Sequence, residues 1–75
     1  MRVLVVDDEP RLAHAVRRGL EAEGFAVDVA ATGDEGLWMA TVVAYDAIVL
    51  DIMLPGMSGY SVCSRLREAG VWTPI

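Results

Sequence analysis

Three short apolar runs are the feature of this sequence that most restricts its fold. They cover residues 2–6, 26–31 and 47–50, and each contains valine or isoleucine. The first and third are almost continuously apolar, whereas the second alternates, with Val27 and Val29 on one face. Runs of this length and composition are typical of β-strands that a parallel sheet buries on both faces. The sequence therefore predicts three strands.

A segment with helical periodicity follows the first predicted strand. It runs from Arg11 to Glu23, with Pro10 at the favoured first position of a helix and Gly24 just past its end. Its apolar positions recur at helical spacing and are expected to share one buried face: Leu12, Ala13, Val16 and Leu20.

Two more helices are predicted after the second and third strands. Thr32 and Glu35 form the T-x-x-E pattern of a capping box, and this helix is expected to end near Val43. Ser58 is a good N-cap for the third helix, which should stop near Gly70. Strands that alternate with helices in this way predict an α/β fold with a parallel sheet and right-handed crossovers.

Length, composition and charge narrow the class of protein. Seventy-five residues allow one small domain, and the net charge of −5, with arginine as the only basic residue type besides one histidine, argues against nucleic-acid binding by this segment. No apolar run approaches the roughly 18 residues that cross a bilayer, and the N-terminus lacks a signal-peptide core. The single cysteine, Cys63, cannot form an internal disulfide. We therefore expect a cytoplasmic protein.

Acidic residues follow two of the three predicted strands. Asp7 and Asp8 come directly after the first strand, and Asp51 comes directly after the third. Ligand sites of open parallel sheets form at the carboxyl ends of strands, so neighbouring strands would bring the three carboxylates together. Their mutual repulsion favours a hard cation such as Mg²⁺, which also recruits phosphate oxygens. The pattern predicts a phosphoryl-transfer site, although Asp8 as a helix cap and Asp51 as a turn residue are the alternatives.

Two sequence segments resemble the signatures of a known family. They are V-L-V-V-D-D-E-P at residues 3–10 and I-V-L-D-I-M-L-P-G-M-S-G at residues 48–59. Both are similar to the signature segments of receiver domains in bacterial two-component response regulators, and the resemblance runs along all 75 residues. The sequence around Pro55 is most similar to that of transcriptional regulators that carry a C-terminal winged-helix DNA-binding domain.

The resemblance implies a role for each acidic residue. Asp51 would accept a phosphoryl group from a sensor histidine kinase, and Pro55 and Gly59 would shape the loop that follows it. The implied Mg²⁺ ligands are Asp7, Asp8, Asp51 and the backbone carbonyl of Met53. Such a protein is a regulator that promotes its own phosphorylation, and not an enzyme with an external substrate.

The resemblance also implies a flavodoxin-like receiver fold of three layers, with five parallel strands in the order 2-1-3-4-5. Residues 1–75 would form its N-terminal portion, with strands 2-1-3 present and strands 4 and 5 missing. The later Ser or Thr and Lys of the family site would be missing with them, as would the DNA-binding output domain. An apolar third strand at the sheet edge is a template for pairing, so we expect self-association there or a chain shortened by truncation.

Other classes fit the sequence less well. Phosphatases of the haloacid-dehalogenase type need a second aspartate two residues after the nucleophile, and Met53 occupies that position. A Rossmann unit needs G-x-G-x-x-G after the first strand, where this chain has Asp-Asp-Glu. A receiver-like interaction or dimerisation module that is never phosphorylated remains the alternative function.

The other side chains that could bind a metal or react are not assigned to the site. His14 has no partner at metal-ligand spacing and is expected to face solvent on the first helix, and Cys63 is expected to pack on the third. Trp38 and Trp72 fit either partner contacts or partial burial.

Overall fold

The computed structural model describes all 75 residues and contains six regular elements. In chain order they are β1 (Arg2–Val6), α1 (Pro10–Ala22), β2 (Ala26–Ala30), α2 (Gly33–Val42), β3 (Ala47–Leu50) and α3 (Gly59–Glu68). Each predicted strand and helix is present close to its expected bounds. None of the helices has the length and apolar character that crossing a membrane requires.

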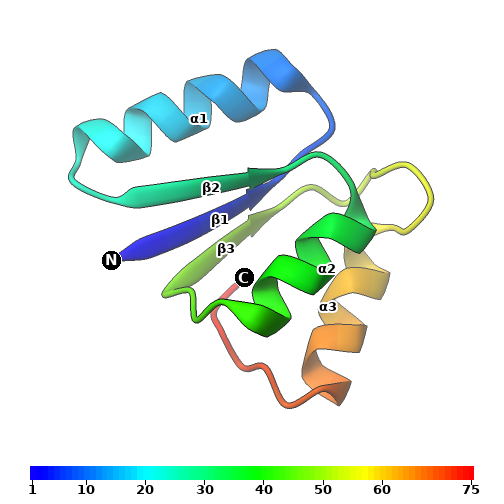
Figure 1. The fold of residues 1–75 in the computed structure, drawn as a ribbon. Coiled ribbons are helices and arrows are strands. Elements are labelled where there is room, and N and C mark those ends of the chain that lie inside the picture. The colour runs from blue at the N-terminus through cyan, green and yellow to red at the C-terminus, as the bar shows by residue number, and fades with distance from the viewer.

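The three strands form one parallel sheet with the order β2-β1-β3. Helix α1 covers one face of this sheet, and α2 and α3 cover the other, which gives three layers (Figure 1). The predicted α/β fold with strand order 2-1-3 is confirmed. Because β1 lies between the other two strands, both of its edges are hydrogen-bonded.

The hydrophobic core is organised around β1. Leu4 and Val6 pack toward α2 and α3, whereas Val3 and Val5 pack toward α1. All four side chains are almost fully buried, which is why this strand reads as a continuous apolar run. Burial on both faces fixes its register, because a shift by one residue would exchange the two sets of side chains.

Helix α1 packs less completely than its periodicity predicts. Ala13 is buried, and Val16 and Leu20 pack against the same cluster while partly exposed, but Leu12 is 52% exposed. The prediction of a buried Leu12 is wrong because α1 packs over β1 and β2 and not over β3. Val49 of β3 consequently stays 46% exposed.

The outer edge of β3 is partly covered by the C-terminal segment. The Ile48 N–H donates to the Pro74 carbonyl oxygen at 2.8 Å. Pro74 therefore lies beside β3. Self-association through this strand stays a prediction.

One arginine organises the chain between α3 and that segment. Nη1 of Arg67 donates to the carbonyl oxygens of Val71 at 2.8 Å and Thr73 at 3.0 Å. Its guanidinium lies 5.5 Å from the ring centre of Trp72, a cation–π distance. Arg67 thus satisfies two carbonyl groups of a segment that has no regular secondary structure.

A polar cluster closes the end of the sheet near the N-terminus. Tyr45 donates its hydroxyl to Oδ2 of Asp28 at 2.7 Å, and Nε of Arg2 donates to the same oxygen at 3.0 Å. Hydrogen bonds from Arg2 and then Tyr45 hold the pKa of Asp28 below its ordinary value. Burial, followed by the hydrogen bond to Asp28, raises the pKa of Tyr45 to about 12.

The raised pKa of Tyr45 predicts a stability loss at high pH. The neutral phenol is favoured in the folded state, so its contribution is complete below the ordinary value of 10.0 and disappears as pH rises toward about 12. We expect Tyr45→Phe to lower the free energy of unfolding by about 1 kcal/mol near neutral pH. Urea unfolding measures this change, and ultraviolet absorbance of tyrosinate should lose its highest-pH step in the variant. A titration step of the variant that remains at the highest pH would show that Tyr45 is not the tyrosine with the raised pKa.

Candidate functional site

The carboxyl ends of β1 and β3 bring the three predicted acidic residues to one edge of the sheet. Asp7 and Asp8 follow β1 directly, and Asp51 follows β3 directly. The sheet hydrogen bonding continues into both ends, because the Asp51 N–H donates to the Val6 carbonyl and the Asp7 N–H donates to the Ala30 carbonyl, each at 3.0 Å. Asp7 and Asp51 are therefore placed by backbone pairing.

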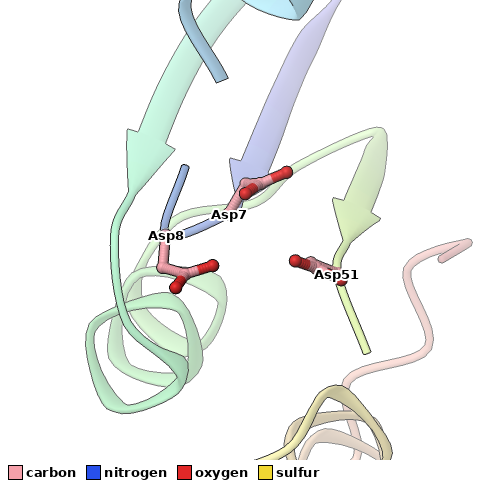
Figure 2. A group of neighbouring side chains, drawn as sticks. All are labelled: Asp7, Asp8 and Asp51. Carbon is pink, nitrogen blue, oxygen red and sulfur yellow. The ribbon is translucent and has the colours of Figure 1, made fainter. Parts of the chain in front are cut away.

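The side chains of these residues converge on a common space. One carboxylate oxygen from each of Asp7, Asp8 and Asp51 lies within 4.8 Å of the other two. Figure 2 shows Asp8 and Asp51 pointing toward one another, with the Asp7 carboxylate beside them. Asp8 is exposed and the other two are partly buried. The cluster is thus open to solvent on one side.

The donor set of this cluster suits a hard divalent cation. Three carboxylates at such separations repel one another, and a cation between them reverses the sign of the interaction. Mg²⁺ binds oxygen ligands, takes few carboxylates and keeps several waters, which an open site allows. No arginine forms an ion pair with any of the three residues. The residues present therefore fit Mg²⁺.

The alternative interpretation of Asp8 as a helix cap is wrong. Glu9 is the N-cap of α1, and its Oε1 accepts a hydrogen bond from the Arg11 N–H at 3.1 Å. Oδ1 of Asp7 in turn accepts from the Glu9 N–H at 2.8 Å. The Asp8 carboxylate remains free of the cap.

The turn interpretation of Asp51 is correct for one of its oxygens. Oδ1 accepts a hydrogen bond from the Met53 N–H at 3.2 Å, which orients the carboxylate without using Oδ2. The Met53 side chain is 83% exposed, so its position in the site depends on its backbone. The role of its carbonyl as a metal ligand stays a prediction.

The loop after Asp51 is closed by Gly59, the first residue of α3. The Gly59 N–H donates to the Ile52 carbonyl oxygen at 2.8 Å. A Cβ atom on Gly59 would overlap the Asp51 carbonyl oxygen and lie 2.8 Å from the Ile52 Cα. The absence of a side chain lets α3 begin directly against the backbone of Asp51.

Sequence reasoning missed two further glycines at this site. Gly33 and Gly36, in the first turns of α2, are both buried and touch the segments that carry the acidic residues. Their signal was the presence of two glycines three positions apart inside a capped helix, which costs helix propensity.

The exposed histidine lies near the site but outside it. His14 and Arg17 of α1 line a cavity of about 240 Å³ that also reaches Asp7 and Asp8. His14 is exposed, as predicted. Asp51 does not line this cavity.

The close approach at Gly59 predicts a large effect from one methyl group. We expect Gly59→Ala to lower the free energy of unfolding by about 1–3 kcal/mol, because the backbone at Asp51 and Ile52 must move. Urea unfolding measures the effect. The neighbouring Tyr60→Ala is the control, since that side chain is exposed and should change stability by less than about 0.5 kcal/mol. Equal stabilities of parent and Gly59→Ala would contradict the close approach.

The sequence of this chain matches a known protein family and known relatives. Residues 3–75 match the response regulator receiver domain family. The transcriptional regulatory protein TcrA of Mycobacterium tuberculosis is 47% identical over 75 residues, which are 100% of this chain and 30% of TcrA. The chain therefore spans less than a third of the length of that relative.

Solved structures show the same fold. The receiver domain of the Francisella response regulator 1452 superposes with a TM-score of 0.94 at 36% identity, over 97% of this chain and 60% of that one. The response regulator TrrA of Thermotoga maritima, solved with Mg²⁺ and BeF, gives a TM-score of 0.87 at 40% identity, over 91% and 59%. TrrA in complex with the histidine kinase ThkA gives 0.84 at 40% identity, over 89% and 58%.

These similarities cover the whole sheet and the acidic edge at which β1 and β3 end. The chain belongs to the response regulator receiver domain family of two-component signal transduction.

Proposed function

We propose that Asp51 accepts a phosphoryl group from a phosphohistidine of a sensor kinase, in a Mg²⁺-dependent reaction. The observation that carries this proposal is the convergence of Asp7, Asp8 and Asp51 within 4.8 Å at the end of a receiver-domain sheet. The Mg²⁺ complex of TrrA supports the choice of ion. The proposed ligands are the three carboxylates and the backbone carbonyl of Met53.

The arrangement of Asp51 suits it for nucleophilic attack. Its Oδ1 is held by the Met53 N–H, so Oδ2 is the oxygen free to attack phosphorus. The new O–P bond forms as the P–N bond to the donor imidazole breaks, and that bond's electron pair stays with the departing nitrogen, which takes up a proton. Bound Mg²⁺ would neutralise charge on the phosphoryl oxygens.

Asp7 and Asp8 hold the metal in this proposal and form no covalent bond. Asp7 is already oriented by the Glu9 N–H, whereas Asp8 is exposed and does not cap α1. Two carboxylates from adjacent chain positions can therefore serve the cation without disturbing α1. Because the group that is modified belongs to the chain itself, the protein acts as a regulator and not as an enzyme.

Replacing the acceptor tests the proposal directly. We expect the parent chain to gain the mass of one phosphoryl group after incubation with acetyl phosphate and Mg²⁺, and Asp51→Asn to gain none, because an amide oxygen is a poor nucleophile. Intact-mass spectrometry measures both. Asp34→Asn, on the exposed first turn of α2, is the control and should be labelled like the parent. Labelling of Asp51→Asn would place the acceptor elsewhere, and a folded but unlabelled parent would contradict phosphoryl acceptance by this chain.

Removing one carboxylate tests the metal site. We expect Asp8→Ala to weaken Mg²⁺ binding by at least about tenfold, the loss that changes to outer-shell partners of a metal already cause. Isothermal titration calorimetry with MgCl₂ measures the dissociation constant. Asp46→Ala is the control, because its carboxylate bonds the Arg2 N–H at the opposite end of the sheet. An equal affinity in parent and Asp8→Ala would remove Asp8 from the metal site.

We propose a sensor histidine kinase as partner, as the complex of TrrA with ThkA suggests. The exposed face of α1, with Arg11, His14 and Arg18, is a candidate docking surface for it. The similarity to TcrA supports a role in transcription regulation. DNA contact would belong to a winged-helix output domain of a longer protein in the cytoplasm.

A further inference from the structure

The first turns of α2 touch both segments that carry the acidic residues. Gly36 lies against Val6, the residue before Asp7, and Gly33 lies against Met57 in the loop that follows Asp51. Figure 1 shows the start of α2 beside the ends of the strands and the loop before α3. We propose that Gly33 and Gly36 are positioning residues, which let α2 pack closely on the end of β1 and on the loop after Asp51, and thereby fix how the three carboxylates are arranged and how tightly they bind Mg²⁺. This inference rests on the proposed metal site.

The contact at Gly36 leaves no room for a side chain. A Cβ atom there would lie 2.7 Å from Cγ2 and 2.9 Å from Cγ1 of Val6, distances that real Cβ atoms do not adopt. Val6 cannot move aside, because it is 1% exposed and its β-branched side chain is stiff. Its backbone is paired with Ala30 on one side and Leu50 on the other. A methyl group at Gly36 must therefore displace α2 or the end of β1.

The contact at Gly33 connects the same helix to the other half of the site. A Cβ atom on Gly33 would lie 2.8 Å from the Met57 carbonyl oxygen and 3.1 Å from Cγ2 of Val62. Met57 belongs to the loop between Asp51 and α3. When α2 shifts away from Val6, this contact opens and the loop loses its support. The helix thus supports both the end of β1 and the loop that follows Asp51.

Helix propensity alone does not account for these glycines. Glycine inside a helix is less favourable than alanine because it loses more backbone freedom on folding. Gly19 in α1 is also inside a helix, but a Cβ atom there meets nothing within 4 Å. Gly19→Ala is therefore a matched control, since it makes the same substitution without a contact near the site.

The test compares Mg²⁺ dissociation constants by calorimetry in the parent, Gly36→Ala, Gly19→Ala, Val6→Ala and the double variant Val6→Ala/Gly36→Ala. We expect Gly36→Ala to bind Mg²⁺ about tenfold more weakly, the size of loss seen when the support of metal ligands is altered, and Gly19→Ala to bind like the parent. Removing the Val6 methyl groups makes room for the new Cβ, so the double variant should bind like Val6→Ala alone. Without Mg²⁺, the amide chemical shifts of Asp7, Asp8 and Asp51 should differ from those of the parent in Gly36→Ala, and in the double variant they should match those of Val6→Ala.

The outcomes separate this inference from the proposed function. A parent chain that binds no Mg²⁺ contradicts the proposed metal site, while parent binding with an equal affinity in Gly36→Ala overturns only the positioning role of the glycines. If Gly36→Ala does not fold by circular dichroism, the double variant decides. A double variant that folds and binds Mg²⁺ like Val6→Ala supports the contact, and one that is unfolded or binds more weakly than Val6→Ala overturns it.

Discussion

Parallel pairing of β1 with both of its neighbours is the constraint on which the rest of the structure depends. Because β1 is bonded along both edges and buried on both faces, its residues have a single possible placement. The same pairing continues one residue beyond the strands, where the Asp51 N–H reaches the Val6 carbonyl. Backbone hydrogen bonds therefore bring the main chains of Asp7 and Asp51 to the same edge of the sheet.

The carboxylates at the two ends of the sheet differ in whether a basic side chain pairs with them. At one end Asp28 is neutralised by Arg2 and bonded to Tyr45, and its pKa is lowered accordingly. At the other end three carboxylates converge and no arginine pairs with them. The first arrangement stabilises the fold by itself, whereas the second is the cation site that we propose. This contrast separates a structural carboxylate from the carboxylates that are available for chemistry.

Local signals in the sequence were sufficient for the elements and for the acidic edge. The apolar runs, the capping box at Thr32 and the position of Asp51 after a strand all depend on neighbours in the chain, and all agree with the structure. The errors and omissions depend on packing between distant segments. Leu12 is exposed because α1 does not extend over β3, and Gly36 is needed because α2 lies directly on Val6. Nothing in a helical pattern states which strand the helix will contact or how closely it will lie. The phosphoryl-acceptor and metal-ligand roles stay predictions for Asp7, Asp8, Asp51 and Met53, because the structure gives the positions of these residues and not their reactions.

The central position of β1 also affects the order in which the chain folds during synthesis. Val3 pairs with Val27 on one edge and with Ala47 on the other. Because β1 is synthesised before β2 and β3, its pairing can be completed only after both of these strands have been made. Closing the longer of these two chain segments costs more entropy than closing the shorter one, and contacts between distant residues slow folding. The most buried strand of the folded chain is therefore left without one of its partners until β3 has left the ribosome.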